Sequence, residues 1–332
     1  MTALTLPSPP RAAPWRKAKA IMDVILHLGA HRTGTTSLQH YLACNARRLA
    51  AQGVRAWGPR RTRNGLLTGV MPTPGVLPPE RQLARARGRL ALALETARAE
   101  GVQTLLVSDE NMIGAARRNL RAGRLYPDAG RRMVRFARAF EGRITRLALS
   151  VRAQDAYWAS VLAYAVARGH RMPDTDDLDR LVTAPRRWRD VIADVARAVP
   201  GAELRILPFE VYGGRPELFG RRVAAGPDWP DAHAREARGA SPRLPALRGI
   251  LAECGRDPAR LPAGDGRWRP FDAAQAAALR AAYAEDMAWL RAGADGIARL
   301  MEEDRPQQTA PQAPQRSATR GRRDDGQERR MA

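Results

Sequence analysis

The residues that could do chemistry begin in a short turn rich in glycine and threonine. Gly29 and Gly34 are separated by four residues and followed by Thr35 and Thr36, which is the spacing of a phosphate-binding loop. In such a loop, backbone N–H groups and the N-terminus of the next helix bind an anion without requiring a charged side chain. The spacing therefore predicts a site for a phosphorylated ligand. The alternative is a tight turn that uses the glycines only for their permissive dihedral angles.

The loop departs from the pattern of a nucleoside triphosphatase at one position. In those enzymes a lysine directly after the second glycine reaches the terminal phosphates, and the hydroxyl that follows binds magnesium. Thr35 occupies the lysine position in this chain, and Arg32 is the only cation inside the loop. Arginine keeps the positive charge and adds a planar fork of N–H donors, but it is not interchangeable with lysine in a crowded site.

The loop sequence resembles the 5′-phosphosulfate loop of sulfotransferases that use 3′-phosphoadenosine 5′-phosphosulfate (PAPS), where Lys-[Ser/Thr]-Gly-Thr-Thr is the common form. The resemblance rests on the run His31-Arg32-Thr33-Gly34-Thr35-Thr36-Ser37. It implies PAPS as the cofactor, no metal, and a set of cofactor-binding residues: His31, Arg32, Thr33, Gly34, Thr35 and Thr36. We also expect Arg32 to be catalytic, because a cation beside the bridging oxygen stabilises the charge that builds there as the S–O bond breaks.

A second phosphate motif follows the apolar run 144–151, which is predicted to be a strand. Arg152 ends this strand, and Ser160 lies eight residues later on the following helix. This order resembles the 3′-phosphate motif of the same sulfotransferases, which implies that both residues bind the cofactor. Arginine provides a bidentate clamp for a phosphate, and the serine hydroxyl adds a neutral donor. The later Gly-Arg-Lys segment of the cytosolic eukaryotic branch has no counterpart that we identify in the sequence.

The sulfuryl acceptor needs a base within hydrogen-bond reach of its hydroxyl group. Glu110 follows the predicted strand 102–107, and glycan- and protein-modifying relatives use a glutamate as the base, so the resemblance implies that Glu110 is catalytic. Asp109, His31 and His170 are alternatives, since histidine serves in the cytosolic branch. The competing interpretation of Glu110 is an ion pair with one of the many arginines.

The elements that must position these residues alternate between strands and helices. Short apolar runs predict strands at 23–28, 102–107, 144–151 and 203–208. Three-and-four spacing of apolar residues, and helix-favouring composition, predict helices that begin near 35 and end before Gly53, and at 79–100, 129–140, 186–199, 243–254 and 272–301. This order predicts an α/β fold, a P-loop-like and mainly parallel sheet flanked by helices, in which ligands gather at the carboxyl ends of strands.

We expect one domain with irregular ends. A sulfotransferase-like domain at 21–303 lies between a disordered N-terminal arm, 1–20, and a disordered C-terminal tail, 304–332, because both ends are rich in proline and arginine and poor in large apolar residues. The segment 58–79 is broken by proline and glycine, and it either lines a substrate site or forms a flexible insertion.

Composition limits the partners. The formal charge of +22 raises the question of nucleic-acid binding, but Lys17 and Lys19 are the only lysines and the arginines are scattered rather than gathered in a stripe, so we expect no specific nucleic-acid partner. The five histidines and two cysteines stand at no metal-ligand spacing. The sequence has no long apolar segment and no apolar core of a signal peptide, so we expect a soluble cytoplasmic protein.

These patterns together predict a sulfotransferase that moves a sulfuryl group from PAPS to an acceptor hydroxyl. Family analogy favours a hydroxyl on a glycan or glycolipid. Two other functions remain open at this point: a P-loop kinase of small molecules, which shares the phosphate loop, and a non-enzymatic protein that binds polyanions. The sequence determines neither the acceptor nor the oligomeric state.

Overall fold

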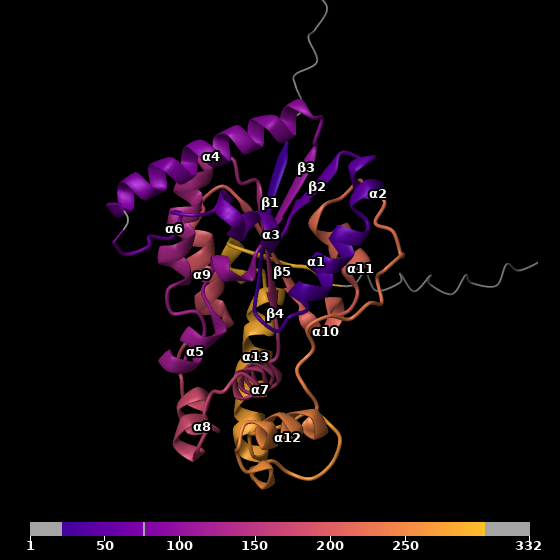
Figure 1. Cartoon of the computed structure of the whole chain (residues 1–332). Helices are drawn as coiled ribbons and strands as arrows, with labels where there is room; N and C mark the ends of the chain where they lie inside the picture. The colour runs from indigo at the N-terminus through magenta and orange to yellow at the C-terminus, as the bar shows by residue number, and fades with distance from the viewer. Residues whose placement is uncertain (1–21, 76, 303–332) are drawn as a thin grey trace, which may run out of the picture. The chain divides into compact units, whose positions relative to one another are not determined.

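The structure is a computed structural model that describes residues 22–75 and 77–302. The arm predicted at 1–20 and the tail predicted at 304–332 lie outside the described residues. Within the described ranges, six parallel strands form one sheet that is flanked by thirteen α-helices (Figure 1). All of these elements belong to one compact unit. The predicted α/β fold with a P-loop-like parallel sheet is confirmed.

The strands match the predicted ones closely, and two short edge strands are additional. They are β1 (Asp23–Gly29), β2 (Val54–Trp57), β3 (Thr104–Ser108), β4 (Arg146–Val151), β5 (Glu203–Pro208) and β6 (Arg299–Leu300).

The helices connect successive strands or follow them. They are α1 (Thr35–Cys44), α2 (Ala46–Ala50), α3 (Pro59–Arg61), α4 (Pro79–Ala99), α5 (Ala116–Ala122), α6 (Ala129–Phe140), α7 (Gln154–Val166), α8 (Thr175–Val182), α9 (Trp188–Ala198), α10 (Phe209–Tyr212), α11 (Pro216–Val223), α12 (Leu244–Glu253) and α13 (Ala273–Arg291). A π-helical turn covers Thr62–Leu66, and 3₁₀ turns cover Glu110–Met112, Pro258–Arg260 and Ala294–Gly296.

The strand order is β2-β3-β1-β4-β5-β6, which places β1 between β3 and β4 near the middle of the sheet. His27 of β1 pairs in register with Ser108 of β3, and Gly29 pairs with Leu149 of β4. Because the strands are parallel, the loops that leave β1, β3 and β4 all emerge at the same edge of the sheet. The fold thereby brings together three predicted site segments that are far apart in the sequence.

Alternate side chains of β1 point to opposite faces of the sheet, and each face is covered by helices. Val24, Leu26 and Leu28 are buried in a cluster with apolar residues of α4, α6, α9 and α13. Ile25 is buried on the other face among residues of α1 and α11. A strand that is covered on both faces has apolar residues at nearly every position, which is why the sequence alone predicted β1.

The last predicted helix, 272–301, is wrong in its last third. The helix α13 ends at Arg291, and the residues that follow form a 3₁₀ turn and then β6, which pairs with β5. Gly293 adopts a left-handed φ of 101°, a conformation that interrupts a helix at little cost only for glycine. None of the described helices is both long and apolar enough to span a membrane.

Candidate functional site

Gly29 ends β1 where the backbone turns and passes very close to other residues. Its φ is +66°, and an added Cβ atom would lie 2.9 Å from Thr35 Oγ1 and 2.9 Å from Glu110 Cβ. Both approaches are shorter than a side chain tolerates, so glycine is required at this position. The phosphate-binding loop therefore runs directly beside Glu110, the predicted base.

The loop from Gly29 to Gly34 is closed by its own threonine. Thr33 Oγ1 donates to the Ala30 carbonyl at 2.6 Å and accepts from the Ala30 N–H at 3.2 Å. Gly34, with a φ of 82°, precedes α1, and no described side chain caps this helix. The N–H groups of its first turn are therefore open to a ligand at the positive end of the helix dipole, which is the anion site that the loop spacing predicts.

The two phosphate motifs meet at Arg32. Its Nε donates to Ser160 Oγ at 3.1 Å, and its Nη2 donates to Ser241 Oγ at 2.6 Å. Arg152 in turn donates to the Arg32 carbonyl at 2.9 Å, and its guanidinium stacks 4.4 Å above the Phe209 ring. The residues of the first motif and of the second, over 100 positions apart in sequence, thus share one hydrogen-bonded cluster.

The side chain of Arg32 lines the loop cavity and is held by two serine hydroxyls. Its guanidinium is turned toward Ser160, the serine of the predicted 3′-phosphate motif, because the hydroxyls of Ser160 and Ser241 are the acceptors within its reach. The proposed action of Arg32 on a bridging oxygen at the loop therefore stays a prediction.

Four arginines crowd this site: Arg32, Arg152, Arg168 and Arg267. Burial, followed by the neighbouring cations Arg267 and Arg32, lowers the pKa of Arg152 to about 10, and the carboxylates of Glu210 and Asp155 offset only part of this shift. Burial and the nearby Arg168 and Arg267 also lower the pKa of Arg32. Within residues 22–75 and 77–302, no carboxylate forms an ion pair with any of the four. Placing like charges together is unfavourable, and a bound anion relieves the repulsion.

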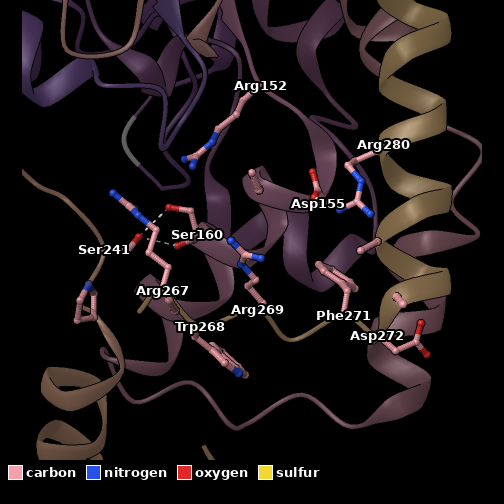
Figure 2. A pocket seen from close by; sticks show the side chains of 16 residues that line it. Arg152, Asp155, Ser160, Ser241, Arg267, Trp268, Arg269, Phe271, Asp272 and Arg280 are labelled. Atoms are coloured by element: carbon pink, nitrogen blue, oxygen red, sulfur yellow. Dashed lines mark hydrogen bonds and ion pairs between the residues drawn. The ribbon is translucent and has the colours of Figure 1, made fainter. Parts of the chain in front are cut away.

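Two cavities open on this cluster and share four of its residues, Arg152, Ser160, Ser241 and Arg267. The first, the loop cavity, measures about 480 Å³ and is lined by the phosphate-binding loop and Glu110. The second, the aromatic cavity, measures about 550 Å³ and contains the buried rings of Trp268 and Phe271. Figure 2 shows Arg152 and Arg267 reaching into this second cavity beside the hydrogen-bonded serine pair.

Arg267 and Ser241 were missed in the sequence. Arg267 lies in the loop between α12 and α13, in the region where we identified no counterpart of the late basic segment of the family. The alternation of basic and aromatic residues in Arg267-Trp268-Arg269-Pro270-Phe271 was a usable signal, because arginine and aromatic rings together suit a phosphorylated ring compound. A single serine in a loop, such as Ser241, carries no comparable signal.

Glu110 lies in the loop cavity, as predicted, and it also forms the ion pair of the competing interpretation. Its Oε1 accepts from Arg63 at 3.0 Å and its Oε2 accepts from Gln39 at 3.1 Å. Burial opposes ionisation, but the hydrogen bonds from the backbone, Arg63 and Gln39 outweigh it and lower the pKa of Glu110. The group is a carboxylate at neutral pH, which is the form that can accept a proton.

The alternative bases lie in less suitable places. Asp109 is buried and bound on both oxygens, accepting from Thr62 and Arg63. The ring of His31 is held between Tyr126 and Asn111, at 2.9 and 3.1 Å. Burial lowers the pKa of His31, and its backbone N–H is bound to the Tyr126 hydroxyl rather than facing the anion site.

His170 lines a separate cavity, away from the phosphate-binding loop. The segment 58–79, by contrast, contributes to the site, because Arg63 from this segment holds both Asp109 and Glu110. Residues 59–66 of the segment form α3 and a π-helical turn, whereas 67–75 and 77–78 consist of turns and irregular backbone.

Comparisons of the chain with protein-family models, with curated proteins and with solved structures found no match. The argument for function therefore rests on the geometry of the site and on the motif resemblance.

Proposed function

We propose that this protein is a sulfotransferase that transfers a sulfuryl group from PAPS to an acceptor hydroxyl. The observation that carries the proposal is the cluster in which Arg32 donates to Ser160 and Arg152 donates to the Arg32 carbonyl, while neither arginine forms an ion pair with a described carboxylate. Two separate anion sites are available, the open first turn of α1 and the arginine cluster, and PAPS carries two separate phosphate-bearing groups. Ligand sites of 300 to 1,000 Å³ are ordinary for compounds of this size, and both cavities fall in that range.

The residues fit the parts of PAPS in an ordered way. The N–H groups that follow Gly34 would bind the phosphosulfate, while Arg152, Ser160 and Arg267 would bind the 3′-phosphate. The aromatic cavity would hold the adenosine through Trp268. When bound, PAPS supplies a sulfur–oxygen bond that breaks as the acceptor oxygen attacks sulfur, and the electron pair of that bond leaves with the phosphate.

Glu110 would take the proton of the acceptor hydroxyl. The carboxylate lies next to the loop because Gly29 has no side chain, so a hydroxyl in the loop cavity could reach both the base and the transferred group. Arg63 and Gln39 hold the carboxylate in a single orientation, which limits the reorganisation needed during the reaction.

A kinase is less well supported by the same loop. Thr35, at the lysine position, directs its hydroxyl to the Ala30 carbonyl at 3.4 Å. Asp109, the carboxylate directly after β3, is bound by Arg63 and Thr62 instead of facing the loop cavity. A magnesium-dependent phosphoryl transfer relies on a cation at the first position and a carboxylate that holds magnesium.

A binding experiment separates the three functions. Thermal unfolding is followed with adenosine 3′,5′-bisphosphate, with ATP and magnesium, and with heparin or DNA, in parallel. We expect adenosine 3′,5′-bisphosphate to stabilise the protein at micromolar concentration without magnesium, by about 3 kcal/mol at a hundredfold excess over its Kd. Preferential stabilisation by ATP with magnesium would support the kinase, and stabilisation by heparin or DNA alone would support polyanion binding.

A further inference from the structure

A third cavity, of about 960 Å³, lies against α1, α2, β2 and α3, and we call it the α1–β2 groove. Figure 1 shows α2 beside β2, the edge strand of the sheet. Its lining is mainly apolar and includes Leu42, Ala43, Ala46, Leu49, Val54 and Ala56. Ala43 and Ala46 are exposed, so solvent reaches the groove. An open apolar cavity of this size is typical of a site for an apolar ligand.

The groove is continuous with the loop cavity. Thr36 and Arg238 line both of them. Gln39 lines the groove and donates to the Glu110 carboxylate at 3.1 Å, so the predicted base lies one side chain away from the groove. The backbone of Arg238 is fixed at the junction, because its backbone N–H donates to Ser37 Oγ at 2.8 Å. A ligand in the groove could therefore extend a hydroxyl group past Gln39 to Glu110.

Positive charge borders the apolar surface. Arg55, Arg60, Arg61 and Arg238 all line the groove, but Arg55 is paired with Glu100 and Arg238 with Glu236. Arg61 stacks 4.6 Å above the Trp57 ring, and Arg60 is exposed with no ion pair to any described carboxylate. Apolar walls bordered by arginines match a ligand that has an apolar body and an acidic group.

We propose that the α1–β2 groove binds the apolar body of the acceptor, and that the acceptor is an acidic amphiphile with a hydroxyl group. This inference rests on the proposed function. The apolar body lies against Ala46 and Leu49, the acidic group faces Arg60, and the hydroxyl reaches Glu110 at the junction with the loop cavity. The acceptor oxygen bonds to sulfur, its proton passes to Glu110, and adenosine 3′,5′-bisphosphate leaves.

A purely polar acceptor fits the groove poorly. A glycan without a lipid presents hydroxyls in every direction, and each one that leaves water needs a hydrogen-bond partner. Apart from the arginines, the polar side chains that line the groove are few: Thr36, Gln39 and His40. The acceptor that the lining favours is thus the lipid-bearing kind rather than a free sugar.

Binding is tested with 12-hydroxystearate, used below its micellar concentration, as a probe with an apolar chain, a hydroxyl and a carboxylate. Isothermal titration calorimetry compares the wild type with Ala46→Trp, which fills the groove from an exposed position. The matched control is Ala84→Trp, at an exposed alanine on α4 outside the groove. We expect Ala46→Trp to weaken binding by at least about tenfold and Ala84→Trp to leave it unchanged. Absence of saturable binding, or equal effects of both substitutions, would overturn the proposal.

The acidic group is tested separately. The wild type should bind the methyl ester of 12-hydroxystearate about tenfold more weakly than the acid, because the ester lacks the negative charge. The Arg60→Glu variant should bind the acid about tenfold more weakly than the wild type does, because it lacks the positive charge. Arg98→Glu, at an exposed position of α4, is the matched control. Equal binding of acid and ester would show that the arginines do not select an acidic ligand and would overturn that part of the proposal.

Transfer is measured by mass spectrometry after incubation with PAPS, and the expected product is the sulfate ester of 12-hydroxystearate. Another outcome is that the protein binds 12-hydroxystearate saturably and is stabilised by adenosine 3′,5′-bisphosphate, yet forms no sulfate ester. That result would overturn the assignment of the groove as the acceptor site but would not contradict the proposed function. If adenosine 3′,5′-bisphosphate does not stabilise the protein, the proposed function fails, and the acceptor assignment fails with it.

Discussion

Arg32 and Arg152 belong to one hydrogen-bonded cluster, and their contacts predict how their substitutions combine. We expect Arg32→Ala and Arg152→Ala each to weaken binding of adenosine 3′,5′-bisphosphate by about 2 to 3 kcal/mol, the scale of lost charge-assisted hydrogen bonds. Because Arg152 donates to the Arg32 carbonyl, the double variant should lose less than the sum. Calorimetric titration measures these effects, with Arg98→Ala on α4 as the control. Fully additive losses would contradict the shared cluster.

In the proposed reaction, Glu110 takes the proton of the acceptor hydroxyl. Glu110→Gln keeps the shape and can still accept from Arg63 at 3.0 Å, but it cannot take a proton. General-base assistance contributes about 10² to 10⁴ in rate, so turnover should fall at least about a hundredfold. The titration with adenosine 3′,5′-bisphosphate is the control and should be unchanged. A variant that keeps more than about a tenth of wild-type turnover would show that Glu110 is not the base.

At the scale of elements, the site depends on how α7 and α10 meet at the end of β4. Glu210 of α10 accepts from the Ala153 N–H at 2.9 Å and from the Tyr283 hydroxyl of α13 at 2.9 Å. The first bond satisfies a backbone donor at the start of α7, next to Arg152. Glu210 thus joins three helices around the arginine cluster.

A second connection fixes the other side of the arginine. The indole Nε1–H of Trp188, at the start of α9, donates to the Arg152 carbonyl at 2.8 Å. Trp188 is buried and packs edge-on against Tyr157 of α7, with ring centroids 5.4 Å apart. Arg152 is therefore positioned by its backbone through two helices, and its guanidinium remains available for a ligand.

At the scale of the whole molecule, the high arginine content has a structural use. Many guanidinium groups bind backbone carbonyls of loops: Arg132 at Asn111 and Met112, Arg186 at Leu125 and Tyr126, Arg248 at Pro262 and Gly264, and Arg256 at Gly169 and His170. Each of these contacts satisfies carbonyl groups that lie outside the α-helices and the sheet. The formal charge of +22 is thus in part a consequence of how the loops are held, and it is weak support for a nucleic-acid function.

The stability of the whole molecule should depend on pH through the buried His27. Burial lowers the pKa of His27 from 6.5 to about 4, so the unfolded chain binds a proton more readily than the native protein. The stabilisation is therefore complete above about pH 6.5 and is lost as the pH falls toward 4, by about 3 kcal/mol in all. Denaturant unfolding at several pH values measures this loss.

His27→Gln is the variant that isolates this effect, since glutamine can keep the hydrogen bond to Ser108 Oγ but does not titrate. His31 also has a lowered pKa, so part of the pH dependence should remain in the variant. We expect the free energy of unfolding to fall less steeply between pH 6.5 and about 4.5 than in the wild type. Identical slopes in the two proteins would show that His27 does not cause the loss.

The sequence by itself determined the features that depend on local spacing. β1 is a continuous apolar run, Gly29 and Gly34 have the dihedral freedom that their turns require, and strands alternate with helices, so the parallel sheet and its phosphate-binding loop were predictable. Where local patterns conflict with tertiary contacts, as beyond Arg291, the prediction failed, because β6 forms only by pairing with β5.

Only the tertiary structure decided which distant side chains act together. Arg267, Ser241 and Arg63 come from segments whose sequences have no periodicity. Arg63 and Ser241 reach the site through contacts over 46 and 209 residues of chain. The direction of the Arg32 guanidinium was likewise set by the hydroxyls that the fold brings near it. Local spacing indicates which residues can bind a phosphate. The packing of the chain determines which side chains surround them, and therefore which groups have no ion pair, which have a lowered pKa and which border a groove.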